Sequence, residues 1–155
     1  MVSVELWTDG SCLKNPGGPG GWAFVLLEAS GQRIESSGGD RETTSNRMEL
    51  TAVLEGLRAT DAGTLVVVTD SEYVQKAFTQ GWLAKWVRND WHTSGKGKPA
   101  VKNRDLWEAL LRESAGRQIT WRHVRGHNGH AENERADHLA YEAAAAVEAR
   151  ISDGF

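Results

Sequence analysis

The sequence predicts an α/β fold with one mixed five-stranded sheet: three antiparallel strands, then two parallel strands, with helices on both faces. Alternating apolar and polar residues, separated by turn-rich stretches, indicate three successive strands near residues 2–9, 22–28 and 32–37. The β-branched run 64–69 and the alternating segment 118–124 are each preceded by a helical pattern. That arrangement is typical of parallel strands in a sheet covered by helices.

Two helices are predicted around the buried run 64–69. The first has an apolar stripe at helical spacing, and Asn46 with Glu49 three residues later resembles a capping box that starts it. The second is expected over residues 72–79, where Asp70 is a candidate cap. The residues of the first stripe are Leu50, Val53, Leu54 and Leu57.

Three further helices are predicted in the second half of the chain. One begins the segment 81–104, and Asn103 is placed to cap the next. A long Ala-rich helix is expected over about 131–150, followed by a flexible tail at 151–155.

Length and composition indicate one domain over residues 1–155, with 39% hydrophobic and 25% charged residues. The single cysteine, Cys12, excludes an internal disulfide framework and fits a reducing compartment. The longest apolar run, Trp22 to Leu27, is far shorter than the roughly 20 residues of a membrane helix. We therefore expect a cytoplasmic protein with no membrane partner.

Positive charge is concentrated in one segment, residues 81–104. It holds six lysines and arginines against one acid, Asp90, in a chain of formal net charge −3. Three of the seven tryptophans lie there too. Basic and aromatic side chains together favour nucleic-acid binding, although a solvated helix face with core tryptophans explains the pattern equally well. The residues are Lys85, Arg88, Lys96, Lys98, Lys102 and Arg104, with Trp82, Trp86 and Trp91.

Acidic residues follow two of the predicted strands. Asp9 ends the first strand and Asp70 follows the buried run 64–69. If these strands are parallel neighbours, both carboxylates lie at one edge of the sheet, where ligands of open α/β sheets gather. Two carboxylates so close repel unless a proton or a cation such as Mg²⁺ lies between them. Taken singly, each aspartate is explained as a turn or cap residue.

Other groups that could act in catalysis have equally plain interpretations on their own. Glu49 is explained as the capping-box acid, and Asp137 lies near the apolar boundary of the Ala-rich helix. The loop 125–130 carries His127 and His130, and a histidine can transfer protons near neutral pH. An exposed loop histidine without a catalytic role fits the same pattern.

The sequence resembles bacterial type I ribonuclease H. The motifs that carry the resemblance run in family order from about residue 4 to residue 144. They are Thr8-Asp9-Gly10-Ser11-Cys12, Asn15-Pro16-Gly17, Thr43 to Leu50, Thr69-Asp70-Ser71 with Tyr73-Val74, Val101-Lys102-Asn103 with Asp105-Leu106-Trp107, Val124 with Gly126-His127, and Asn133 to Asp137.

This resemblance implies a ribonuclease H-like fold and a monomeric endonuclease that hydrolyses the RNA strand of RNA–DNA hybrids. Its four metal-binding carboxylates match Asp9, Glu49, Asp70 and Asp137, and its mobile-loop histidine matches His127. The implied chemistry uses two Mg²⁺ ions, for which Mn²⁺ substitutes, and yields 5′-phosphate and 3′-hydroxyl products.

The resemblance also implies which residues hold the hybrid. Four positions flank the RNA strand, a pocket grips a DNA phosphate, and a basic protrusion over residues 81–104 holds the DNA strand. Such backbone contacts predict binding that weakens steeply with salt. The RNA-strand positions are Cys12, Asn15, Asn46 and Glu72, the phosphate pocket is Thr43 and Asn46, and the protrusion includes Trp82, Lys85, Trp86 and Arg88.

Some positions depart from the family pattern, among them Val87 and Asp90, which make the protrusion less basic than in some relatives. Residue 72 is Glu where relatives commonly carry Gln, so its carboxylate would repel phosphate or add a metal contact. The turn at 17–21 has one extra glycine. Two other functions remain open: a hybrid-binding module without catalysis, and a different nuclease or strand-transfer enzyme on the same fold.

Overall fold

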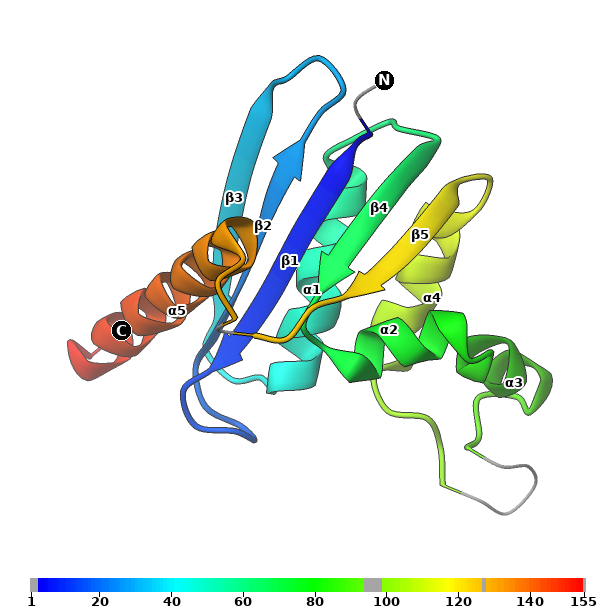
Figure 1. The fold of residues 1–155 in the computed structure, drawn as a ribbon. Coiled ribbons are helices and arrows are strands. Elements are labelled where there is room, and N and C mark those ends of the chain that lie inside the picture. The colour runs from blue at the N-terminus through cyan, green and yellow to red at the C-terminus, as the bar shows by residue number, and fades with distance from the viewer. Residues whose placement is uncertain (1–2, 94–98, 127, 155) are drawn as a thin grey trace.

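In the computed structural model, which describes residues 3–93, 99–126 and 128–154, five strands form one sheet (Figure 1). The first three strands pair antiparallel, and the last two run parallel to the first, in the order β3-β2-β1-β4-β5. This confirms the predicted mixed sheet. The strands are β1 (Glu5–Cys12), β2 (Gly20–Leu27), β3 (Arg33–Asp40), β4 (Thr64–Thr69) and β5 (Gln118–His123).

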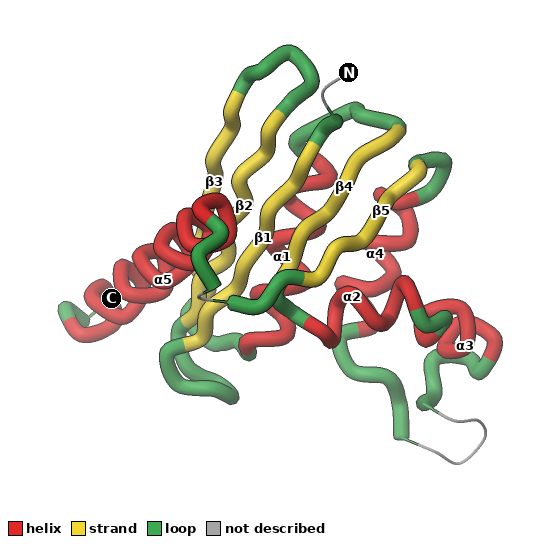
Figure 2. Tube along the Cα trace, in the orientation of Figure 1, coloured by secondary structure: helices red, strands yellow, loops and turns green. Residues whose placement is uncertain are grey.

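Helices cover both faces of the sheet, as predicted. The last helix, α5, crosses one face over β1, β2 and β3, whereas α1 packs on the opposite face with α4 beside it (Figures 1 and 2). From the end of β4 the chain continues into α2 and then α3, which projects beyond the sheet (Figure 1). The helices are α1 (Ser45–Arg58), α2 (Glu72–Thr79), α3 (Trp82–Arg88), α4 (Arg104–Ser114) and α5 (Ala131–Ser152).

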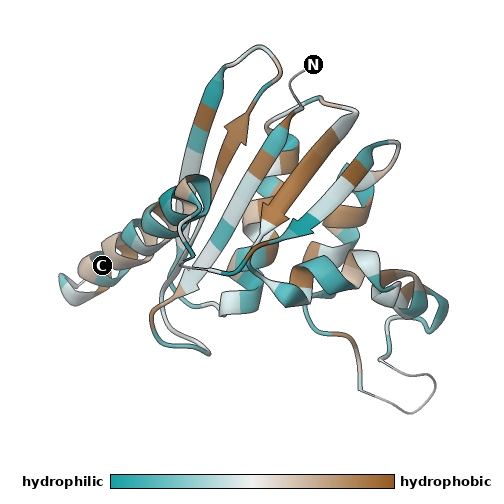
Figure 3. Cartoon of the chain, in the orientation of Figure 1, coloured by the Kyte–Doolittle hydropathy of each residue, from teal (hydrophilic) through white to brown (hydrophobic). Residues whose placement is uncertain are grey.

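Alternation along the strands divides the core between the two faces. Leu6 belongs to the larger apolar cluster beneath α1 and α4, and the next residue, Trp7, belongs to the smaller cluster beneath α5. The central strand β4 contributes Val67 to the first and Val68 to the second, so it is apolar along most of its length (Figure 3). A strand with both faces covered needs this continuous β-branched run.

Several elements extend further than the sequence predicts. The first strand is predicted to end at Asp9 but continues to Cys12, because its antiparallel pairing with β2 runs on to Gly20. The pairing of Gly20 with Asp40 likewise extends β3 beyond residue 37. The final helix continues to Ser152, so part of the expected tail is helical.

Two of the three predicted helix caps are wrong. The N-cap of α1 is Thr44, whose hydroxyl accepts from the Arg47 amide at 3.1 Å, so Asn46 and Glu49 form no capping box. Ser71, not Asp70, caps α2. Asn103 is the N-cap residue of α4, as predicted, but it has a left-handed conformation, φ 65°, and makes no side-chain capping bond to the described residues.

Candidate active site

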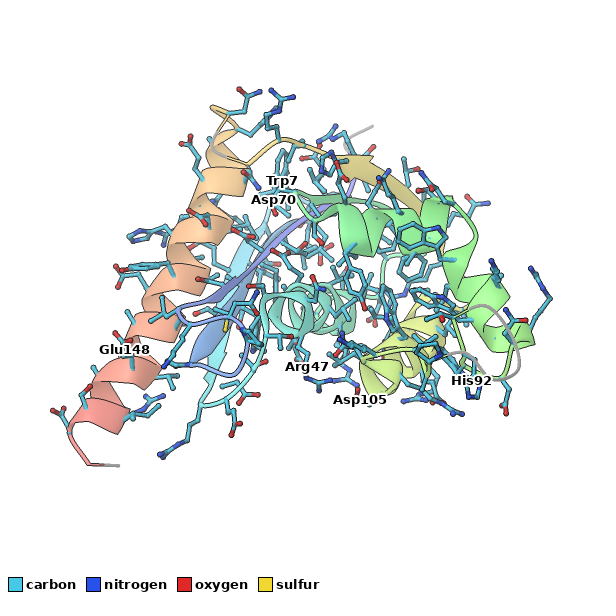
Figure 4. The ribbon with its side chains drawn as sticks, turned by 90° about the horizontal axis from the view of Figure 1, so that it is seen from below. Trp7, Arg47, Asp70, His92, Asp105 and Glu148 are labelled. Atoms are coloured by element: carbon cyan, nitrogen blue, oxygen red, sulfur yellow. The ribbon has the colours of Figure 1, made fainter. Side chains whose placement is uncertain are left out.

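Asp9 and Asp70 lie side by side where the two central parallel strands separate. The parallel register of β1 and β4 ends with Thr8 opposite Thr69, and each aspartate is the next residue. The antiparallel pairing of β1 with β2 continues past Asp9, which holds its backbone in the sheet. The expected meeting of these two carboxylates at one edge is therefore present, and Figure 4 views the molecule from this end.

Helix α1 brings Glu49 to the same place. Its first turn passes directly over β1 at Gly10, where a Cβ would lie 2.5 Å from the carbonyl carbon of Met48 and would also clash with the Glu49 amide. Only glycine permits this approach. Because α1 lies so close, the Glu49 side chain is buried against Asp9 instead of capping the helix.

The three carboxylates form a compact cluster. Asp9, Glu49 and Asp70 each offer an oxygen, and these oxygens lie within 4.8 Å of one another. The Gly10 amide donates a hydrogen bond of 2.9 Å to Asp9 Oδ1. The buried Glu49 Oε2 has no hydrogen-bond partner among the described residues.

Burial and mutual repulsion raise the pKa of two of these groups. Burial is the largest cause for Asp9, followed by the charge of Asp70, and together with weaker effects they raise the pKa of Asp9 to about 8. Burial, then the charges of Asp9 and Asp70, raise the pKa of Glu49 well above its usual value. At neutral pH such a cluster retains a proton unless a cation replaces it.

Asp137 lies beside this cluster rather than within it. It is half-buried on α5, and its charge and a side-chain hydrogen bond to Asp9 both raise the pKa of Asp9. The group of three described carboxylates within 4.8 Å does not include it. The fourth predicted ligand is therefore close to Asp9 and comes from the opposite face of the sheet.

The donor set fits a hard divalent cation. Mg²⁺ prefers oxygen ligands, and carboxylates supply them. A buried acceptor is nearly always paired, so Glu49 Oε2 beside two more carboxylates needs either a proton or a cation as its partner. Asp9, Glu49 and Asp70 could hold such an ion, with Asp137 adjacent.

Three of the predicted hybrid-binding residues lie where the end of β1 and the loop between β1 and β2 meet the segment that leads into α1. Cys12 Sγ lies 3.6 Å from the Thr43 carbonyl oxygen, and Asn15 Oδ1 accepts from the Ser45 amide at 3.2 Å. Two backbone hydrogen bonds join this loop to the segment before α1: the Thr43 amide donates to the Gly18 carbonyl oxygen, and the Gly17 amide donates to the Thr43 carbonyl oxygen. The buried Thr43 Oγ1 finds no partner within the described ranges.

Asn46 lies beside a group of residues whose contacts with one another the sequence did not predict. Asn46, Tyr73 and Asn103 line one cavity of about 270 Å³. Asn103 donates to the Tyr73 hydroxyl at 3.3 Å and accepts from Arg47 at 3.3 Å. Arg47 also pairs with Asp105 at 2.8 Å, and these two side chains meet between α1 and α4 (Figure 4). The motif 101–107 is the available signal in the sequence, but its pattern predicts only a cap role for Asn103.

The predicted protrusion is only partly solvent-facing in the described residues. Trp82 and Trp86 pack against the core, and Trp86 meets Trp107 edge-on at 5.4 Å. Lys85 and Arg88 are exposed on α3. The core interpretation of these tryptophans is therefore confirmed, whereas their role in nucleic-acid binding stays a prediction. Trp86 also lines the cavity with Asn46. Lys96 and Lys98 lie outside the described residues.

Two remaining predictions have different outcomes. Glu72 pairs with Lys76 at 3.1 Å, and that hydrogen bond lowers the pKa of Glu72. The lysine offsets the charge that would repel phosphate, and Glu72 is not one of the three clustered carboxylates. His127 lies outside the described residues, so its predicted role stays a prediction.

The sheet order and the carboxylate cluster define an α/β enzyme with an acidic site at the carboxyl ends of its central parallel strands. The RNase H family model matches residues 1–145. The Ribonuclease H of Hahella chejuensis (strain KCTC 2396) is 51% identical over 141 residues, which cover 90% of this chain and 92% of its own length. The chain belongs to the RNase H family.

Further relatives agree in sequence and in structure. The Ribonuclease H of Thermus thermophilus is 52% identical over 138 residues, 88% of this chain and 81% of its own. LC9-RNase H1, a type 1 RNase H with the type 2 active-site motif, superimposes with a TM-score of 0.80 at 35% identity, over 92% of this chain and 72% of that chain. LC11-RNase H1, solved in complex with RNA/DNA hybrid, shares the fold with a TM-score of 0.66 at 24% identity, over 91% and 96% of the two chains.

No helix within the described ranges has both the length and the apolar character needed to cross a membrane.

Proposed function

We propose that this enzyme hydrolyses the RNA strand of RNA–DNA hybrids at the cluster of Asp9, Glu49 and Asp70, with Asp137 as a fourth ligand. The observation that carries the proposal is the approach of three carboxylate oxygens within 4.8 Å, one of them from Glu49, whose buried Oε2 has no hydrogen-bond partner among the described residues. Relatives about 50% identical over most of this chain are ribonucleases H.

The cofactor is proposed to be a pair of Mg²⁺ ions, for which Mn²⁺ substitutes. When bound, such ions lower the pKa of a water molecule and offset the charge that develops on the leaving 3′ oxygen. The products then carry 5′-phosphate and 3′-hydroxyl ends.

The protein's own part is to hold the carboxylates in place before substrate arrives. The strands β1 and β4 hold the backbones of Asp9 and Asp70, and the Gly10 amide fixes one Asp9 oxygen. Glu49 is held on a helix packed directly against β1. His127 is proposed to assist proton transfer or product release from the loop that precedes α5.

The hybrid is proposed to lie across the β1–β2 loop, the start of α1 and α3. Cys12, Asn15, Asn46 and Glu72 would face the RNA strand, whose 2′-hydroxyl groups distinguish it from DNA. Thr43, whose buried hydroxyl needs a partner, would donate to a DNA phosphate. Trp82, Lys85, Trp86 and Arg88 would hold the DNA strand further along. We also place the enzyme in the cytoplasm, where its free thiol Cys12 stays reduced.

A cleavage gel with the RNA strand labelled tests the proposal. The wild-type protein should cut the hybrid with Mg²⁺ and stop when a chelator is added. Asp70→Asn should abolish cleavage while the fold survives, and the control Asp61→Asn, at an exposed acid outside the cluster, should cut at the wild-type rate.

Cleavage by Asp70→Asn at a near wild-type rate would overturn the proposal. Hybrid binding without cleavage by the wild-type protein would identify a binding module instead. Equal cutting of DNA–DNA or RNA–RNA duplexes would indicate a different nuclease.

A further inference from the structure

Two glycines lie in the loop between β5 and α5, and they are there for different physical reasons. Gly129 has φ 81°, in the left-handed region that favours glycine. Gly126 has no positive φ, so its backbone would accept an alanine. What excludes a side chain at Gly126 is space, because a Cβ there would lie 2.8 Å from Asp70 Oδ2.

The backbone that leads to Gly126 is firmly attached to the end of β4. The Val124 amide donates to the Thr69 carbonyl oxygen at 3.0 Å, and His123 Nε2 lies 3.1 Å from the Asp70 carbonyl oxygen. Val124 is buried in the apolar cluster beneath α5. Gly126, two residues further on, is thus held against the Asp70 side chain.

A methyl group at residue 126 would displace the more mobile of the two neighbours. The backbone before Gly126 is held by hydrogen bonds and burial, whereas the Asp70 carboxylate is the free end of a short side chain. Rotation of the carboxylate relieves the contact at low cost. That rotation would take an oxygen of Asp70 away from the oxygens of Asp9 and Glu49.

We propose that Gly126 is a positioning residue for the Asp70 carboxylate. Because it has no side chain, it allows Asp70 Oδ2 to keep the position from which a Cβ at residue 126 would displace it. This inference rests on the proposed function only in taking Asp70 as a ligand for a divalent cation. It assigns Gly126 a steric role in metal binding instead of a role in loop flexibility.

The test compares Gly126→Ala with Gly63→Ala, at a glycine that also lacks a positive φ and whose Cβ would meet no described atom within 4 Å. Titration of the substrate-free proteins with MnCl₂, followed by calorimetry, measures metal affinity directly. Because groups that orient metal ligands typically contribute 10- to 100-fold, we expect Gly126→Ala to weaken Mn²⁺ binding by about 10- to 100-fold. Its melting temperature without metal and its affinity for hybrid in chelator should match those of Gly63→Ala.

An Asp70→Ala background isolates the contact itself. With the carboxylate removed, adding Gly126→Ala should cause no further loss of Mn²⁺ affinity. A Gly126→Ala protein that binds Mn²⁺ as tightly as Gly63→Ala would overturn the inference, and so would an equal loss in the Asp70→Ala background. Wild-type protein that binds no Mn²⁺ would overturn it too, whereas wild-type protein that binds Mn²⁺ but leaves hybrid intact would contradict only the proposed function.

Discussion

At the residue scale, the main feature of the site is that its buried carboxylates lower the stability of the folded protein when no cation is bound. Asp9 and Glu49 are buried beside Asp70, and burial is the largest cause of the raised pKa of both. A pKa raised on folding means that ionisation of the group opposes folding. Without a cation, the ionised cluster therefore lowers the stability of the fold.

The first prediction concerns Asp9→Asn in metal-free protein. The pKa of Asp9 rises from 3.8 to about 8 on folding, so its contribution to stability is fully present below about pH 4 and is lost as the pH rises towards 8. Asparagine does not ionise. The variant should therefore match the wild type near pH 4 and exceed it by on the order of a few kcal/mol above pH 8.

Urea unfolding in chelator, repeated from pH 4 to pH 9, measures this difference. Asp61→Asn serves as the control, because Asp61 is exposed. Parallel stability curves for Asp9→Asn and the wild type would contradict the raised pKa.

The sequence predicts which residues form the site more readily than it predicts the contacts between them. Asp9 and Asp70 can be placed at one sheet edge because both follow strands that the apolar patterns indicate. Glu49 is identified only through the family resemblance, since its spacing from Asn46 also fits a capping box. The contact of Gly126 with Asp70 joins residues more than 50 positions apart, and no local pattern records it.

At the element scale, an ion-pair network anchors the start of α5 to the edge strand β3. Arg33 contacts Glu132 at 2.6 Å, and Arg135 contacts Glu35 at 3.0 Å. Glu35 also pairs with Arg33 at 2.9 Å, and these partners lower the pKa of Glu35 to about 2. The N-cap of α5 makes no side-chain hydrogen bond to described residues. The ion pairs to β3 hold the first turns of the helix instead.

The second prediction is that Glu35→Gln loosens the first turns of α5 without unfolding the protein. Amide hydrogen exchange over residues 132–138 should accelerate roughly two- to fivefold, the range expected when exposed ion pairs are removed. Salt at 1 M should bring the wild type towards the variant, because these groups are exposed and therefore screened. Glu142→Gln, whose partner His138 lies on the same helix, should leave exchange unchanged.

Exchange that is equal in Glu35→Gln and Glu142→Gln would show that the network does not anchor the helix. The element that carries Asp137 would then be held by its apolar face alone.

Element types follow from the sequence more closely than element ends. The bounds of β4 and α2 agree with the prediction, since the β-branched run 64–69 is a local signal, although the residue that caps α2 is Ser71 and not Asp70. The ends of β1 and β3 depend on partner strands, which continue the pairing through residues of low strand preference such as Gly20 and Gly39. Local patterns cannot reveal such pairing.

At the scale of the whole molecule, charges of opposite sign are separated. The carboxylate cluster lies at the ends of β1 and β4, while Lys85 and Arg88 are exposed on α3. When basic side chains such as these bind the phosphates of a nucleic acid, counterions are released. The affinity for the hybrid should therefore fall as the salt concentration rises.

The third prediction is that Lys85→Ala with Arg88→Ala weakens hybrid binding and flattens its salt dependence. In an Asp70→Asn background, which prevents cleavage, the slope of log affinity against log salt should fall by about 2, one for each phosphate contact. Arg150→Ala, at the far end of α5, is the matched control. An unchanged slope would show that α3 does not hold phosphates.

Anomalous scattering from Mn²⁺ in crystals of the wild-type protein would locate the metal among the three clustered carboxylates. We expect anomalous density bounded by carboxylate oxygens of Asp9, Glu49 and Asp70, and none at the exposed acid Asp61. Crystals that bind Mn²⁺ only elsewhere, with these three carboxylates turned apart, would contradict this expectation.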